Sequence, residues 1–100
     1  MQNSINLKKH HYNYGIDELA YFDEGKGRQT ILLIHGFGED NTVWKNQIVF
    51  LSAHYRIIAP NLPGVQCKPL AIHHSQAPSI RMYVEVLHEL MHHLGIEQYF

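Results

Sequence analysis

Hydrophobic residues along the chain fall into strand-like and helix-like patterns. Residues 30–34 form an unbroken β-branched and aliphatic run, which indicates that residues 30–35 are a strand buried on both faces, as in a parallel sheet. Residues 55–59, which are apolar or aromatic apart from Arg56, predict a second buried strand. Residues 10–14 and 19–23 alternate imperfectly on either side of a Gly-Ile-Asp turn, so they predict an antiparallel hairpin. Residues 1–9 show neither pattern, and we expect a loose lead-in.

The first helical pattern covers residues 42–53. Asp40 and Asn41 precede it, and both residue types are good helix N-caps. Trp44 lies on the apolar side of this helix, and we expect it to pack in the core, as most large aromatic side chains do.

The second helical pattern begins after Ser79, which is suited to an N-cap, and ends at Gly95, which is suited to the left-handed position that follows a helix. We expect Ile96 to turn back and contact the last helical turn. Residues 98–100 resemble the beginning of another strand. The predicted apolar stripe of this helix consists of Ile80, Tyr83, Val84, Leu87, Met91 and Leu94.

The order of these elements is a hairpin followed by strand, helix, strand and helix, which predicts an α/β fold with a mostly parallel core. We assign residues 1–100 to part of a single domain. Open α/β sheets bind ligands beyond the carboxyl ends of their strands. The turn that follows residues 30–35 is therefore the first candidate for a site.

That turn contains Phe37 between Gly36 and Gly38. Backbone N–H groups at a glycine-flanked bend suit an oxygen that gains negative charge during acyl transfer. They also suit a phosphate at a helix N-terminus. The segment matches the first two glycines of the dinucleotide-binding fingerprint, but Asn41 replaces the third and two acids stand where a pyrophosphate would be repelled. A plain loop between a strand and a helix is the third interpretation.

Composition narrows the possible classes of protein. With 100 residues, 45% hydrophobic and 17% charged, the chain is typical of a soluble domain. A formal net charge of -1 gives no reason to expect nucleic acid or an anionic membrane as a partner. Cys67 is the only cysteine, which excludes an intrachain disulfide and fits a reducing compartment. Residues 1–9 lack the apolar region of a signal peptide and no apolar run approaches the roughly 20 residues of a membrane span, so we expect a cytoplasmic location.

A second motif, His88-Glu89-x-x-His92, has the spacing of a zinc-peptidase helix and is an alternative interpretation. On a helical wheel, however, His88 lies at the edge of the apolar stripe, His92 lies further toward water, and Glu89 points nearly opposite. The sequence that follows the motif is short, and we expect no further metal ligand from it. The pair His73 and His74, in the loop predicted for residues 65–78, is typical of solvated surface, because a metal there would need ligands that the sequence does not place.

Three segments together resemble the α/β-hydrolase fold family, from about Leu19 to Phe100. They are His35-Gly36-Phe37-Gly38 after its hydrophobic strand, residues 44–51, and residues 55–64, in the family's order and spacing. The resemblance implies that Phe37 supplies one backbone N–H of an oxyanion hole. It also implies that His35, Gly36 and Gly38 support the loop, with His35 holding it by hydrogen bonds. It implies a small-molecule substrate and neither a metal nor an organic cofactor. Asn61 departs from the pattern, because many members carry Asp there, and residues 65–67 are larger than is usual.

A serine hydrolase also needs a nucleophile in a Gly-x-Ser-x-Gly turn, an acid and a histidine. None of Ser4, Ser52, Ser75 or Ser79 has that context. By the resemblance, the nucleophile would follow Phe100, on a strand that starts near Tyr99 and lies beside residues 30–35. The sequence therefore predicts the N-terminal portion of an α/β hydrolase, ending before the nucleophile and inactive alone. The parent activity would be hydrolysis of a small ester or a related carbonyl or epoxide substrate. The alternatives are a zinc metallopeptidase and a non-catalytic, doubly wound nucleotide-binding module.

Overall fold

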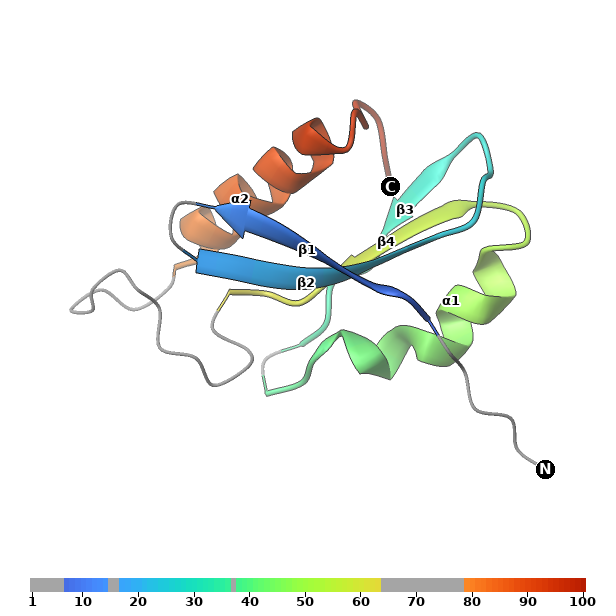
Figure 1. Cartoon of the computed structure of the whole chain (residues 1–100), viewed down its shortest axis with the longest axis horizontal. Helices are drawn as coiled ribbons and strands as arrows, with labels where there is room; N and C mark the ends of the chain where they lie inside the picture. Colours follow the sequence, from blue (N-terminus) through green and yellow to red (C-terminus); the bar gives the residue numbers. More distant parts are fainter. Residues whose placement is uncertain (1–6, 15–16, 37, 64–78) are drawn as a thin grey trace.

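The computed structural model describes residues 7–14, 17–36, 38–63 and 79–100. Its sheet has four strands in the order β1-β2-β4-β3 (Figure 1). The β1–β2 and β2–β4 pairs are antiparallel, and β3 and β4 are parallel. The elements are β1 (Lys9–Tyr14), β2 (Asp17–Glu24), β3 (Thr30–Leu32), the 3-10 helix η1 (Asn41–Trp44), α1 (Lys45–Leu51), β4 (Arg56–Pro60) and α2 (Ile80–His93). The predicted hairpin and α/β order are confirmed.

The core has two parts, one on each face of the sheet. On one face, η1 and α1 cover Phe22, Ile57 and Ala59 through the buried Ile48 and the partly buried Trp44. Trp44 therefore packs in the core, as predicted. On the other face, α2 covers a second cluster, made up of Leu19, Tyr21, Ile58, Val86, Leu90, Met91 and Ile96. The sheet thus lies between α1 and α2, which are on opposite sides of it in Figure 1.

β4 is the buried strand predicted for residues 55–59, whereas residues 30–35 are less buried than predicted and form a shorter strand. Ile57 and Ile58 of β4 are fully buried, whereas β3 ends at Leu32 and Ile34 is 49% exposed. The reason lies in the strand order, because β4 has a neighbour on each side and β3 is last in the sheet.

Phe100 lies alongside the outer edge of β3. Its N–H donates to the Thr30 carbonyl (3.0 Å), and its own carbonyl accepts from the Leu32 N–H (2.8 Å). These two bonds flank Ile31, which is the pattern of a parallel ladder. The chain therefore returns to this edge where the sequence predicted the next strand to start.

The ends of α2 are as predicted, but its buried face is not. Ser79 caps the first turn by accepting from the Met82 N–H (3.2 Å). At the other end Gly95 has φ +75, its N–H donates to His92, and the Ile96 N–H donates to Met91, which together form a Schellman motif. The face that is buried carries Val86, Leu87, Leu90 and Met91.

Two residues of the predicted stripe, Ile80 and Val84, are 78% and 60% exposed. The sheet covers the side of the helix next to the stripe that carries Val86 and Leu90, which the prediction did not include. Val84 lies on the opposite side of the stripe, and Ile80 is the first residue of the helix. Periodicity identifies a stripe about 100° wide but does not decide which of its flanks meets the sheet.

Several predictions fall on residues outside the described part of the chain. They are the lead-in over residues 1–6 and the loop over residues 65–78, which includes Cys67, His73 and His74. The predicted helix over residues 42–53 is described, and it begins as η1 at Asn41 and ends as α1 at Leu51.

Candidate functional site

The loops that follow β3 and β4 lie side by side, because these strands are parallel neighbours. The buried His35 ties the two loops together. Its Nδ1 lies 2.8 Å from the Gly36 carbonyl, and its Nε2 lies 3.0 Å from the backbone N–H of Leu62. A carbonyl only accepts and an amide only donates, so Nδ1 carries the proton and Nε2 accepts. His35 is therefore neutral in this arrangement, and both of its ring nitrogens are occupied.

A pair of buried asparagines joins the same two loops. The Asn41 backbone N–H donates to the Asn61 Oδ1 (2.7 Å), and the Asn41 Nδ2 donates to the Ala59 carbonyl (2.8 Å). The Asn61 backbone N–H donates to the Ala20 carbonyl of β2 (2.9 Å). Asn41 and Asn61 are only 1% and 3% exposed, so these hydrogen bonds lie in the interior.

Sequence reasoning missed this asparagine pair. The sequence predicts a cap at Asp40 or Asn41, and Asp40 caps η1 by accepting from the Thr42 N–H (2.9 Å), whereas Asn41 makes the buried contacts given above. Asn61 was noted as a departure from the family's Asp, and that substitution was the available signal. Its Oδ1 supplies the acceptor that a carboxylate would supply at the same place.

The glycine turn is closed by Glu39. The Gly36 N–H donates to the Glu39 Oε1 (2.9 Å), and the Glu39 N–H donates back to the Gly36 carbonyl (3.2 Å). Gly38 has φ +83, a left-handed conformation that favours glycine. Phe37, the residue predicted to supply the oxyanion-hole amide, lies outside the described residues. His35, Gly36 and Gly38, which were predicted to support it, are therefore the described part of the site.

Asp40 completes the polar groups of this loop. Its carboxylate accepts hydrogen bonds from the hydroxyl and the backbone N–H of Thr42. These two bonds, the hydroxyl bond first, lower the pKa of Asp40 below its ordinary value. The loop therefore enters η1 with an ionised cap at neutral pH.

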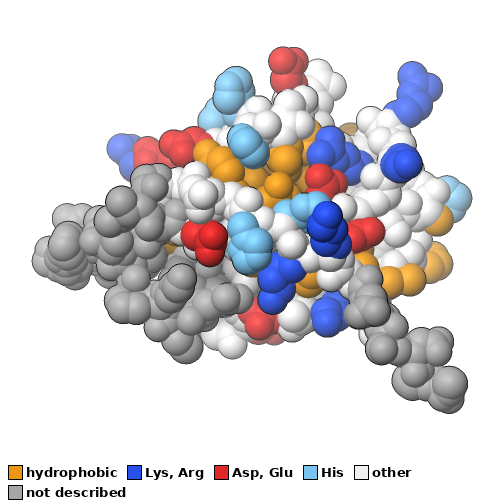
Figure 2. Space-filling view, viewed as in Figure 1, with side chains coloured by type: hydrophobic (Ala, Val, Ile, Leu, Met, Phe, Trp, Pro, Cys, Tyr) orange, Lys and Arg blue, Asp and Glu red, His pale blue; other side chains and the backbone are white. Residues whose placement is uncertain are grey.

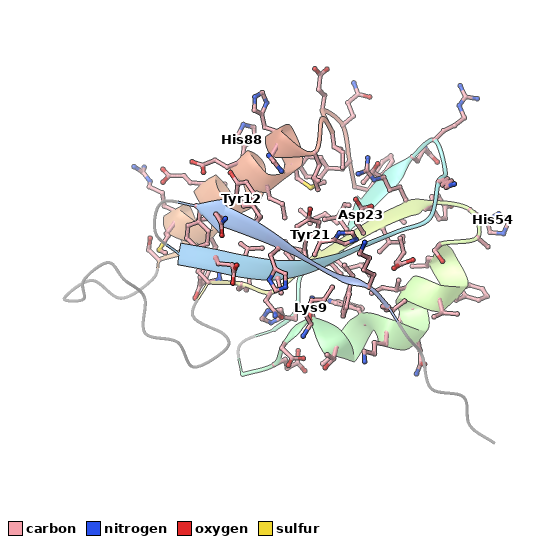
Figure 3. The ribbon with its side chains drawn as sticks, in the orientation of Figure 1. Lys9, Tyr12, Tyr21, Asp23, His54 and His88 are labelled. Atoms are coloured by element: carbon pink, nitrogen blue, oxygen red, sulfur yellow. The ribbon has the colours of Figure 1, made fainter. Side chains whose placement is uncertain are left out.

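His88, Glu89 and His92 are exposed residues of α2, and Figure 3 labels His88. Glu89 interacts with Tyr12 of β1, and the pKa of the Tyr12 hydroxyl is raised by burial, by the charge of Glu89 and by their hydrogen bond. Among residues 7–14, 17–36, 38–63 and 79–100, no three His, Cys, Asp or Glu side chains are grouped so as to hold a metal ion. Nothing described here supports the zinc interpretation.

Other surface features lie away from the carboxyl ends of the strands. A shallow hollow of about 710 Å³ is lined by Arg28, Gln29, Ala53 and His54, at the amino ends of β3 and β4. On the face in Figure 2, acidic, basic and histidine side chains are interspersed and do not form a patch of one sign. None of the described helices has both the length and the apolarity needed to cross a lipid bilayer.

A sheet covered on both faces, with a glycine turn at the carboxyl end of a parallel strand, defines an open α/β fold, and proteins of this class generally bind ligands at that end. No protein-family model matches the chain. Curated relatives do match it, among them two hydrolases. It is 44% identical over 55 residues to 2-hydroxy-6-oxo-6-(2'-aminophenyl)hexa-2,4-dienoic acid hydrolase from Metapseudomonas resinovorans, covering 52% of this chain and 19% of the relative. It is 41% identical over 44 residues to (E)-2-((N-methylformamido)methylene)succinate hydrolase from Acinetobacter baylyi, covering 44% of this chain and 16% of the relative.

Solved structures agree with these relatives over a longer stretch. A bacterial membrane phospholipase A is 26% identical with a TM-score of 0.78, over 93% of this chain and 30% of that chain. An epoxide hydrolase from Vigna radiata is 26% identical with a TM-score of 0.72, over 94% of this chain and 30% of that chain. The chain thus spans less than a fifth of these curated relatives and about a third of these structures. Its neighbours are α/β hydrolases, and it has their fold.

Proposed function

We propose that this chain is the amino-terminal portion of an α/β-hydrolase domain, whose complete form hydrolyses a small ester or a related carbonyl or epoxide substrate. The observation that carries the proposal is the position of the glycine turn. It follows β3, at the carboxyl end of the parallel β3–β4 pair, and His35 and Asn41 tie it to the loop after β4. Ligands of open α/β sheets bind in this place.

In the proposed reaction of an ester, a nucleophile outside these 100 residues attacks the carbonyl carbon, the alcohol leaves with a proton, and water then releases the acid and restores the nucleophile. The backbone N–H of Phe37 stabilises the oxygen on which negative charge develops, together with a second N–H that also lies outside this chain. His35, Gly36 and Gly38 hold the loop and take no part in proton transfer. Because both nitrogens of His35 are already hydrogen-bonded to the backbone, it is poorly placed to act as a base.

The proposal needs neither a metal nor an organic cofactor, and its partner is a small-molecule substrate. It places the protein in the cytoplasm, in keeping with its single cysteine and mixed surface charge. Because the nucleophile, the acid and the catalytic histidine are all outside residues 1–100, this chain by itself should not turn over an ester.

The test is to remove the Phe37 N–H while keeping the loop. In the gene product translated through the coding sequence that follows Phe100, Phe37→Pro deletes the backbone donor, and Phe37→Ala is the matched control that keeps it. We expect Phe37→Pro to lower kcat for a p-nitrophenyl ester about 100- to 1,000-fold, the usual effect of losing one oxyanion-hole donor. We expect Phe37→Ala to keep most of the activity.

Equal thermal unfolding midpoints for the two variants show that the proline has not unfolded the loop. If the proline variant unfolds earlier, semisynthesis with an ester in place of the Phe37 amide removes the same N–H without a ring. An ester-linked or proline variant that matches Phe37→Ala in kcat would refute the proposed role of Phe37. Absence of esterase and epoxide hydrolase activity in the unmodified gene product would refute the proposed reaction.

A further inference from the structure

The contact that His35 makes between the loops after β3 and β4 requires a neutral imidazole ring. Its Nδ1–H donates to the Gly36 carbonyl at 2.8 Å, and its Nε2 accepts the Leu62 N–H at 3.0 Å. His35 is only 4% exposed, so water cannot readily replace either partner. Both ring nitrogens are therefore used, and the one that reaches across to the other loop is used as an acceptor.

Protonation of the ring would remove that acceptor. An imidazolium ring donates from both nitrogens, so Nε2 would then present an N–H to the N–H of Leu62. The bond to Gly36 would remain, because Nδ1 donates in both forms of the ring. The contact between the loops is therefore complete above the pH range in which histidine takes up its proton, and it is lost as the pH falls through that range.

The acidic side chains near His35 favour a protonated ring. The Glu39 carboxylate accepts the N–H of Gly36, the residue that follows His35. The pKa of Asp40 is lowered mainly by hydrogen bonds within its own turn, and further by the charges of His35 and of Lys9 in β1. Because this electrostatic coupling is mutual, the Asp40 carboxylate also stabilises a positive His35. The described residues of the loop after β4 carry no titratable side chain.

A second contact between the same loops does not titrate. The Asn41 N–H donates to the Asn61 Oδ1 at 2.7 Å, and the Asn61 N–H donates to the Ala20 carbonyl of β2 at 2.9 Å. Amide groups neither gain nor lose a proton near neutral pH. These bonds therefore hold Asn61 in place whether or not its neighbour Leu62 keeps its partner.

We infer that His35 makes the loop after β4 sensitive to acid, so that Leu62 is released below about pH 6 while Asn61 stays fixed. The release is local and begins at the residue that follows the asparagine contact. It goes beyond the proposed function and does not depend on it, because it needs only contacts among described residues and no substrate.

The test is amide hydrogen exchange in the gene product translated through the coding sequence that follows Phe100. Rates are measured from about pH 7.5 to about pH 5 and corrected for the intrinsic effect of pH. We expect protection of the Leu62 N–H to fall about 10- to 100-fold, the range for losing one buried hydrogen bond. The Asn41 N–H is the internal control, and its protection should change less than about twofold.

Two outcomes of this experiment would overturn the inference. Protection of the Leu62 N–H that does not vary with pH would show that the ring does not control the contact. An equal loss of protection at Leu62 and Asn41 would show that the two loops open together, in which case His35 does not act locally.

His35→Gln and His54→Gln are the matched variants. Glutamine at position 35 can place its Oε1 near the position of Nε2 and does not titrate, so protection of Leu62 should no longer depend on pH. His54 is an exposed histidine between α1 and β4, and its replacement should leave the pH dependence as in the parent. A glutamine variant at position 35 that keeps the parent's pH dependence would refute the role of His35.

A measurement on the parent protein covers the case in which His35→Gln does not fold. With nitrogen-15 in histidine and leucine, NMR detects the coupling between the two nitrogens of the Leu62 N–H···Nε2 bond directly. We expect this coupling at neutral pH and its loss in step with protonation of the His35 ring. A coupling that persists after the ring is protonated would overturn the inference.

Discussion

Asn41 and Asn61 should lose very different amounts of stability on the same substitution, Asn→Asp. Each contributes one half of its amide group to the buried contact between the loops. Asn61 offers its Oδ1 to a backbone N–H, and Asn41 offers its Nδ2 to the carbonyl of Ala59. A backbone N–H cannot accept and a carbonyl cannot donate, so these orientations are chemically determined. Aspartate keeps the oxygen acceptor but removes the donor.

The magnitudes follow from burial. Asn61→Asp keeps the 2.7 Å bond and makes it charge-assisted, which offsets part of the cost of burying a carboxylate, so we expect a loss of stability of below about 1 kcal/mol. Asn41→Asp places a carboxylate oxygen against the Ala59 carbonyl at a site that is 1% exposed. It loses the hydrogen bond and buries an unpaired charge, and we expect a loss of about 3 kcal/mol or more.

The pH dependence of Asn41→Asp gives an internal check. The protonated carboxyl has an O–H that can donate to the Ala59 carbonyl, and the ionised form does not, so the folded state raises the pKa of the introduced group. A raised folded-state pKa favours the folded state at low pH and loses that contribution as the pH rises. The deficit relative to the parent should therefore be smallest below about pH 4 and should grow toward neutral pH.

The assay is urea unfolding followed through the fluorescence of Trp44, the only tryptophan, which packs against the core beside α1. With a denaturant slope of about 1–3 kcal/mol per molar urea, 3 kcal/mol moves the midpoint by about 1–3 M. Asn61→Asp should stay within about 1 M of the parent. Equal destabilisation by the two aspartates, or a deficit in Asn41→Asp that does not vary with pH, would refute the assigned hydrogen-bond directions.

Further predictions concern the turn before β3, the cap of η1 and the unused histidines. Gly27→Ala should lower the thermal midpoint by about 10 °C or more, because its Cβ would overlap backbone atoms of the α1–β4 loop. The Cβ in Gly95→Ala would meet open space, so we expect a loss of only about 1–2 kcal/mol in the free energy of unfolding, caused by the left-handed φ. Asp40→Ala should cost about 1 kcal/mol near pH 6, and because the pKa of Asp40 is lowered, that difference should persist above pH 3.8 and vanish as the pH falls further. We expect His88 and His92 to hold no metal, so a chelator should leave the thermal midpoint unchanged, and a lower midpoint would contradict this.

The elements that could be predicted from sequence are those that local chemistry determines. The cap at Ser79 and the Schellman motif at Gly95 each depend on a few neighbouring residues, and both are found as predicted. The strand over residues 55–59 also follows from its apolar residues Ile57, Ile58 and Ala59. Such signals need no knowledge of what the element packs against.

The features that could not be predicted depend on distant neighbours. Residues 30–35 have the composition of a buried strand, but their burial depends on strand order, and Ile34 is half exposed because β3 is last in the sheet. The roles of Asn41 and Asn61 require knowing that residues twenty positions apart meet beneath the same loops. An asparagine beside a helix start predicts a cap, and only the fold shows that it is a buried donor.

The partners of the glycine turn also distinguish the two ligand chemistries that its sequence suggests. A phosphate at the start of η1 would need free backbone donors, but the Gly36 N–H is held by Glu39 and the Thr42 N–H is held by Asp40. An incoming phosphate would have to displace two carboxylates of the same loop and would meet their charge in doing so. A developing oxyanion needs only one backbone N–H from this loop, and its negative charge exists only transiently. The acids that exclude a resident anion therefore leave the hydrolytic role chemically open.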